Sequence, residues 1–177
     1  MIPNRFHEMR ALLMVALAVL LPLSAAALPE DVEQEVLSDF EFIELFPNEG
    51  LTILKGAADK PACIDQGTMR ICGNEIRLEQ ADDGSLQKVT ATGAPVRFQQ
   101  QVEADQELSY LSGQVLVFDN TGQLLTVDGD AEFSQAGNVL THDHIEYDLE
   151  SGRVSANSSN DGERGQMMVS PQPNTSN

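Results

Sequence analysis

Two short acidic and histidine-containing segments carry the residue types that could do metal chemistry. In "VDGDAE", Asp128 and Asp130 could hold calcium, but their spacing is not that of an EF-hand loop, and no Gly-Gly-x-Gly-x-Asp repeat surrounds them. In "THDHIEY", His142 and His144 fall on one face of a strand, which a metal could use. The chain has 3 histidines, and the third is His7, near the N-terminus. We therefore predict no metal site and no cofactor.

The motifs of the commoner hydrolytic and phosphate chemistries are absent from the sequence. There is no Gly-x-Ser-x-Gly elbow, no phosphate-binding loop and no cysteine–histidine pair in a nucleophile context. Acidic side chains are frequent, at 28, but nothing singles out the two carboxylates that glycoside hydrolysis needs. We predict no catalytic residue and no enzyme, with a secreted glycan-active enzyme as an alternative.

The chain contains two cysteines, Cys63 and Cys72, which are too few for a structural zinc site. A turn is predicted between them at residues 65–68. A two-residue hairpin loop there would place Cys63 opposite Arg70, so a disulfide would need a bulge or a wider turn. The sequence leaves the pairing open.

The elements that must position these residues are predicted to be strands. Apolar and polar side chains alternate, with Val, Ile, Phe and Tyr prominent, in "EIRLE" (75–79), "VRFQ" (96–99), "ELSYL" (107–111), "QVLVFD" (114–119) and "HIEYDL" (144–149). Turn signals separate them, such as Asp83-Gly84, Asn120-Thr121-Gly122, Gly137-Asn138 and Ser151-Gly152. This spacing favours an all-antiparallel sandwich, barrel or roll. Residues 30–37 could form a helix or an extended segment.

A repeat connects three glycines, Gly56, Gly93 and Gly129, which are 37 and 36 residues apart. An apolar residue stands two positions before each glycine, and a small residue or proline two after it. Glycines inside strands mark bulges or close backbone approaches, so we interpret the repeat as architectural.

The ends of the chain predict export and a single domain. Residues 1–27 combine Arg5 and Arg10, a short apolar run and an Ala-x-Ala boundary, which is typical of a cleaved signal peptide. Residues 28–170 have the length of one domain, and residues 171–177 form a polar tail. The net charge of −18 repels phosphate backbones, so nucleic acid is a poor candidate partner.

The run from "LTILKGAADKPACID" to "IEYDLESGRVSA", about residues 51–156, resembles the OstA-like family of periplasmic lipopolysaccharide-transport bridge proteins, often called LptA. The most recognisable pieces are "GAPVRF" followed by "LSY", and "IEYDLESGRVSA". The two cysteines are not part of the family's pattern.

The resemblance implies a twisted, open-ended β-jelly roll of many short antiparallel strands, with an apolar interior that holds the acyl chains of lipid A. It implies no catalytic residue, and a location in the periplasm of a Gram-negative bacterium. Motif position gives the lipid-facing role to Phe98 and Tyr110. Alternation adds seven further lipid-facing candidates: Val36, Ile76, Leu78, Leu108, Phe133, Ile145 and Tyr147.

The resemblance also implies end-to-end assembly of copies by pairing of edge strands. One edge is expected at "QMMVS", made of Gln166, Met167, Met168, Val169 and Ser170, and the other within residues 32–43. The implied partners are lipopolysaccharide, other copies of the chain, and the inner-membrane-anchored and outer-membrane components of the transport machinery. The alternative is a structural or adhesive β-repeat protein with a solid core and no lipid.

Overall fold

The computed structural model describes residues 34–57, 59–101, 107–157 and 164–171. The predicted signal peptide and nearly all of the predicted polar tail lie outside these residues. Within them the chain is almost entirely β-structure, and the 3₁₀ turn η1 (Pro47–Glu49) is too short and too polar to cross a membrane. No longer helix is present in the described ranges.

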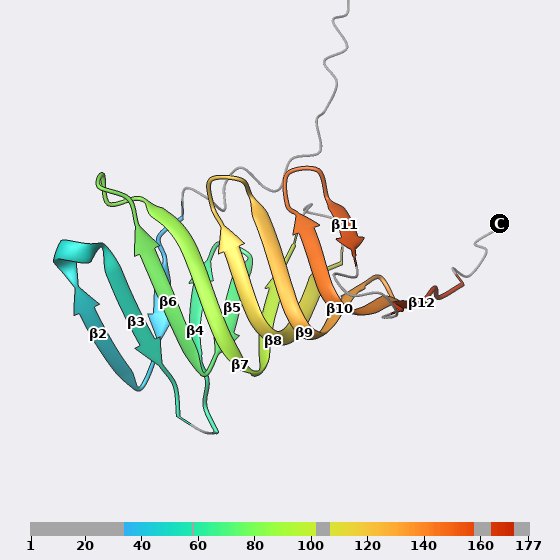
Figure 1. Ribbon diagram of the computed structural model, residues 1–177, viewed down its shortest axis with the longest axis horizontal. Coiled ribbons are helices and arrows are strands. Elements are labelled where there is room, and N and C mark those ends of the chain that lie inside the picture. Colours follow the sequence, from blue (N-terminus) through green and yellow to red (C-terminus); the bar gives the residue numbers. More distant parts are fainter. Residues whose placement is uncertain (1–33, 58, 102–106, 158–163, 172–177) are drawn as a thin grey trace, which may run out of the picture.

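All of the strands belong to one 12-stranded antiparallel sheet (Figure 1). The strands are β1 (Leu37–Asp39), β2 (Phe42–Phe46), β3 (Leu51–Lys55), β4 (Ala62–Gln66), β5 (Met69–Gly73), β6 (Glu75–Gln80), β7 (Leu86–Gln100), β8 (Ser109–Asp119), β9 (Leu124–Gln135), β10 (Asn138–Asp148), β11 (Arg153–Ala156) and β12 (Gln166–Met168). The predicted jelly-roll class is confirmed, although its central strands are long and bent.

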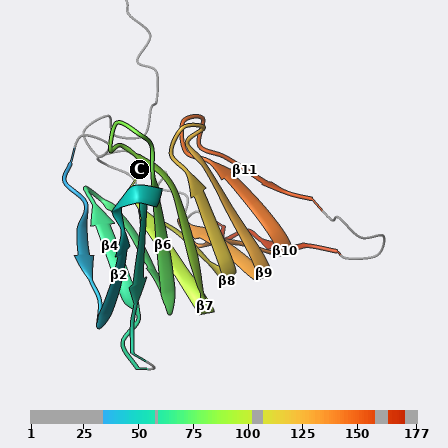
Figure 2. The ribbon, with the colours of Figure 1, turned by 60° about the vertical axis from the view of Figure 1, so that its left-hand side comes forward.

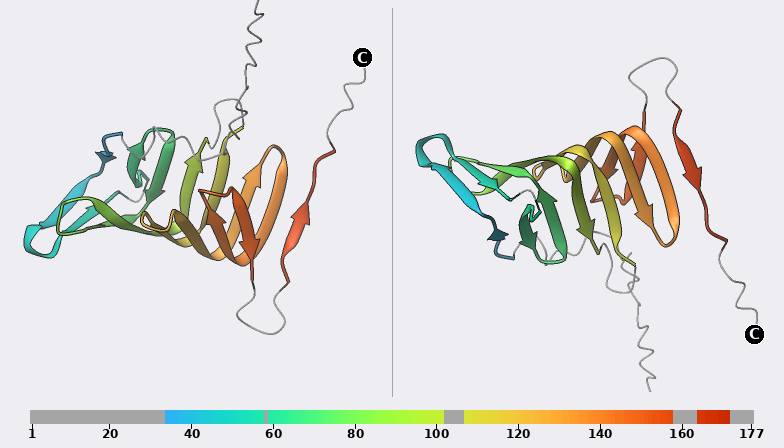
Figure 3. Two further views of the ribbon diagram at one scale, coloured as in Figure 1. Left: turned by 90° about the horizontal axis from the view of Figure 1, so that it is seen from above. Right: turned by 90° about the horizontal axis from the view of Figure 1, so that it is seen from below.

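The sheet folds over on itself into two facing layers, which Figure 3 shows from above and from below. We call leaf A the layer made of β2, β3, β6, β11 and residues 86–92, 115–119, 124–128 and 144–148. Leaf B is made of β1, β4, β5, β12 and residues 96–100, 109–113, 131–135 and 138–142. Strands β7 to β10 pass from one leaf into the other.

The passage between the leaves is a row of β-bulges, which we call the corner. Register shifts fall between Thr92 and Val96 in β7, and between His142 and His144 in β10. Bulges bend a strand and increase its twist, so a row of them turns the whole sheet at one line. Two glycines of the predicted repeat, Gly93 and Gly129, fall within these shifts, whereas the third, Gly56, directly follows β3.

At two positions in the corner, the backbone conformation or the surrounding atoms leave no room for a side chain. Gly129 has a φ of +75°, where a side chain would be strained and would also meet the side chain of Gln114 at 2.8 Å. A Cβ at Gly113 would lie 3.1 Å from the carbonyl oxygens of Asp128 and Gly129 on the next strand. Gly113 is not part of the repeat, but a Cβ at Gly56 would meet the backbone nitrogen of Ala62, and one at Gly93 would lie 3.2 Å from that of Asn74. The repeat therefore marks positions with little room for a side chain, as expected from an architectural role.

Two predicted strands, residues 107–111 and 114–119, are one strand in the structure. β8 runs without a break from Ser109 to Asp119 and bends at Gly113, because its hydrogen-bonding partners change register there. Of the ambiguous segment 30–37, the described part is not helical, and its last residue, Leu37, begins β1.

The two cysteines are joined by a disulfide, with 4.2 Å between their Cα atoms. The predicted register was wrong: Cys63 pairs with Cys72, and Arg70 pairs with Asp65. The two-residue turn is Gly67-Thr68, where Gly67 takes a φ of 58°, one residue later than expected. No bulge is needed, since this turn alone aligns the two sulfur-bearing residues.

Candidate functional site

The interior between the leaves is one continuous apolar cluster, and both leaves contribute side chains to it. Residues that pair directly across antiparallel strands share a face, so the pairings define rows that cross the sheet. In leaf B one such row connects Ile64, Ile71, Phe98 and Leu111. The buried cluster contains Leu54, Ala62, Ile64, Met69, Ile71, Ile76, Val89, Ala91, Val96, Phe98, Leu111, Leu116, Phe118, Leu125, Val127, Ala131, Ile145, Tyr147 and Leu149.

Most of the residues predicted to face a lipid do lie in this interior. Phe98, Ile76, Ile145 and Tyr147 are at most 2% exposed. Phe133 and Leu78 pack against the cluster and are half-buried. Phe133 and Tyr147 meet edge to face, with 5.5 Å between ring centroids, and so join leaf B to leaf A.

Three predicted lipid-facing residues do not belong to the interior. Tyr110 is 46% exposed and points out of leaf B, because its neighbours Ser109 and Leu111 take the inward positions of β8. Leu108 precedes β8 and lines an outer hollow together with Tyr110. Val36 precedes β1 and is 39% exposed. The inward placement of Tyr110 and Val36 was therefore wrong, and Leu108 is half-buried but outside the buried cluster.

The sequence reading also missed inward residues beyond the corner, such as Leu116, Phe118 and Leu125. Alternation within "QVLVFD" could have identified the first two. Leu125 lies opposite Phe118 and Tyr147. Its inward position could not be predicted without the register of β8, β9 and β10.

Exposed apolar side chains collect at the two ends of the roll, at the strands with one partner each. At the N-terminal end these are Leu37, Phe40, Phe42, Ile43, Leu45 and Phe46, on or beside β1 and β2. At the opposite end they are Met167, Met168 and Val169, on or just after β12. Figures 1 and 2 show these strands on opposite sides of the molecule.

The predicted C-terminal edge is present but shorter than expected. Gln166 to Met168 pair with Thr141 to Val139 of β10, while Val169 and Ser170 lie beyond the strand. Ser170 is held instead by side-chain contacts, since its hydroxyl donates to the carbonyl of Gly137 at 2.7 Å.

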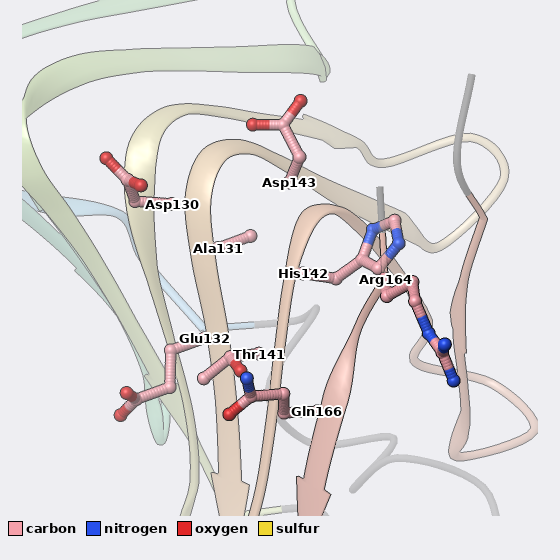
Figure 4. Close-up of a pocket in the computed structure, with 8 residues that line it drawn as sticks. All are labelled: Asp130, Ala131, Glu132, Thr141, His142, Asp143, Arg164 and Gln166. Carbon is pink, nitrogen blue, oxygen red and sulfur yellow. The ribbon is translucent and has the colours of Figure 1, made fainter. Parts of the chain in front are cut away.

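A surface hollow of about 450 Å³ lies where β12 begins beside β10 (Figure 4). Its lining includes the carboxylates of Asp130, Glu132 and Asp143 and the guanidinium of Arg164. Asp130 accepts a hydrogen bond from Gln114 at 3.0 Å. Such a charged, open lining would not shelter an acyl chain from water.

The two histidines singled out as metal candidates are engaged separately. Nδ1 of His142 accepts a hydrogen bond from the backbone N–H of His144 at 3.1 Å. Nδ1 of His144 lies 2.6 Å from Asp128, and this hydrogen bond raises the pKa of His144 above its usual value. In the described part of the chain, no group of three or more His, Cys, Asp or Glu residues is arranged to hold a metal.

Comparison with known proteins identifies relatives of one kind. The family model described as LptA/(LptD N-terminal domain) LPS transport protein matches residues 62–153. The Lipopolysaccharide export system protein LptH of Pseudomonas aeruginosa is 26% identical over 149 residues, which cover 84% of this chain and 81% of that protein. The crystal structure of LptH, the LptA homologous periplasmic component of a lipopolysaccharide transport device from P. aeruginosa, superposes with a TM-score of 0.73. It is 23% identical and covers 81% of this chain and 100% of that chain.

Proposed function

Because this chain belongs to the LptA/(LptD N-terminal domain) family of LPS transport proteins, we propose that it carries lipopolysaccharide through the periplasm of a Gram-negative bacterium. The acyl chains of lipid A would lie between leaf A and leaf B, shielded from water on their way from the inner to the outer membrane. No catalytic residue takes part in this role.

The observation that carries the proposal is the continuous apolar cluster that both leaves share. Its members come from β3 to β10 and so extend along the roll. Exposing an acyl chain costs about 0.8 kcal/mol for each methylene, or roughly 10 kcal/mol for a dozen carbons. A carrier must therefore offer apolar surface along its whole path, which a roll with this interior can do.

The acyl chains would have to displace side chains, because the centre of the roll is filled. Ile71, Ile76, Leu116 and Ile145 are 0% exposed. The corner is a line of paired, bulged strands, whereas no strand pairing among the described residues joins the opposite strand ends of leaf A to those of leaf B. Separation of the leaves along that open side, which we call the mouth, would admit a lipid without breaking strand pairing.

The same filled centre would suit the alternative, a structural or adhesive β-repeat protein without a lipid ligand. The two functions differ in one property that can be measured, the uptake of an acyl chain. The family membership favours the carrier.

Copies of the chain are proposed to join end to end into a bridge. Since every strand pairing is antiparallel, β2 runs opposite to β11, and β1 runs opposite to β12. Stacked copies could therefore continue both leaves through antiparallel pairs, with the exposed apolar side chains of the two ends buried at the junction. The terminal copies would join the inner-membrane-anchored and outer-membrane components of the transport machinery in the same way.

The carrier function is tested by displacement of an environment-sensitive fluorescent fatty acid from the purified mature chain. Lipopolysaccharide should displace the probe, and the same saccharide stripped of its acyl chains should not. If the folded chain takes up no probe, or if the stripped saccharide competes equally well, acyl shielding is not its function.

A further inference from the structure

One buried side-chain acceptor in the described part of the interior has no hydrogen-bond partner. Gln100, the last residue of β7, is 4% exposed, and its Oε1 atom accepts no hydrogen bond. It lies on the inner face of leaf B, because Val96 and Phe98 of the same strand are inward and buried. Buried side-chain acceptors in folded proteins nearly always have a partner, since leaving one unpaired loses its hydration without replacement.

One hydroxyl-bearing residue lies opposite Gln100, and a second hydroxyl group contacts the first. Ser109 pairs directly with Gln100 across β7 and β8, so both side chains share the inner face. The hydroxyl of Ser109, which is 0% exposed, lies 3.4 Å from that of Tyr147 on leaf A. This contact bridges the two leaves. Burial raises the pKa of the Tyr147 phenol, so its hydroxyl proton is retained.

The three residues stand at the mouth. Gln100 ends β7 and Ser109 begins β8, so both are at the strand ends farthest from the corner in leaf B. The residues nearer the corner on the same strands, Val96, Phe98 and Leu111, are apolar. The side chains of the interior are thus apolar near the corner and become uncharged and polar at the mouth. In a bound lipid, this is where the acyl chains would end and the head group would begin.

The neighbouring inward positions of leaf B are also uncharged, and all of them except Met69 are polar. Gln66 and Met69 face each other at the end of β4 and β5, and Gln135 and Asn138 at the end of β9 and β10. Asn138 already accepts a hydrogen bond from the backbone N–H of Ser170 at 3.2 Å, and the amide of Gln66 donates to the carbonyl of Gln34 at 3.3 Å. Gln100, in the middle of this row, is the member with an unoccupied buried acceptor.

We propose that Gln100, which lies opposite Ser109 and its contact Tyr147, accepts a hydrogen bond from a hydroxyl or amide N–H carried at the head of a bound acyl chain. This proposal rests on the carrier function. An uncharged acceptor of this kind changes affinity by about three- to tenfold, which favours a matching lipid and still allows its release to the next carrier. Gln100 is thus a residue that selects among acylated ligands.

The test compares two probes, 3-hydroxytetradecanoic acid and tetradecanoic acid, on the wild-type chain, Gln100→Met and Gln99→Met. Methionine has nearly the length and flexibility of glutamine but no hydrogen-bonding amide. Gln99 is the matched control, since it is the adjacent glutamine on the outer face of the same strand. The readout is the ratio of the two dissociation constants, measured by displacement of the fluorescent fatty acid.

Gln100→Met is expected to lower the preference for the hydroxylated acid by about three- to tenfold. It should keep the affinity for tetradecanoic acid, and its melting temperature without ligand should rise, because an unpaired buried acceptor is removed. Gln99→Met should leave the ratio unchanged.

An unchanged ratio in Gln100→Met, with both acids still bound, would overturn the proposal and leave the carrier function intact. If Gln100→Met lost affinity for both acids equally, Gln100 would have a structural role, and the proposal would be overturned as well. If the wild-type chain binds neither acid, the carrier function fails and the proposal falls with it.

Discussion

At the scale of single residues, the inward or outward position of a side chain depends on the neighbouring strand. In "ELSYL" the alternation offers two sets, one with Tyr110 and Leu108 and one with Ser109 and Leu111. The structure chooses the second, because Leu111 lies opposite Phe98 in the buried row. A phenol tolerates an outer surface well, since its hydroxyl can meet water. Motif position therefore assigned Tyr110 to the wrong face of its strand.

The disulfide is a residue-scale feature with a measurable effect. Replacing both cysteines, with Cys63→Ala and Cys72→Ala, should lower the free energy of unfolding by about 2–3 kcal/mol, because the crosslink closes a short loop in the unfolded chain. Urea denaturation of the oxidised wild type and the double variant measures the difference. Adding reductant should destabilise the wild type and leave the double variant unchanged. An equal response of both proteins would contradict this account.

At the scale of elements, the sequence predicted strands and turns well and their connections less well. The tight turns at Gly84 and Gly152 separate strands as expected. The bent strands could not be predicted, because a bulge is defined by two strands that shift against each other, and alternation describes one strand at a time. For the same reason alternation could not indicate that Ser109 would lie opposite Gln100 and contact Tyr147 on the other leaf.

The edge strands lead to a prediction about assembly. Leu45 of β2 and Met167 of β12 are 62% and 68% exposed, and both belong to rows that face the interior. Leu45→Asp and Met167→Asp should each abolish self-association at high concentration, because each buries a charge in the proposed junction. Their exposure in the single chain means that neither change should unfold it. Light scattering of each variant measures the effect.

A mixture of the two variants tests the polarity of that junction. Leu45→Asp keeps an intact C-terminal end and Met167→Asp an intact N-terminal end, so the equimolar mixture should form dimers and nothing larger. Tyr110→Asp, on the outer face of a central strand, should associate like the wild type. If Met167→Asp alone associates normally, copies meet through their N-terminal ends and the end-to-end arrangement is wrong.

At the scale of the whole molecule, an open-ended roll combines two properties that a relay needs. Its interior is apolar along its length, and its two ends present free strand edges of opposite direction. At the corner, continuous strands and their hydrogen bonds hold the two leaves together. The leaves can therefore separate only at the mouth. The function follows from this arrangement more than from any single residue.

The most direct test of the central claim, that acyl chains lie between the leaves, uses a photo-crosslinking side chain in place of Phe98. The same side chain at Gln99, the next residue and on the opposite face, is the matched control. After irradiation with lipopolysaccharide, the folded protein substituted at Phe98 should carry a lipid adduct, and the protein substituted at Gln99 should carry none. Adducts at neither position, or equally at both, would contradict the account and leave Phe98 as an ordinary part of a closed core.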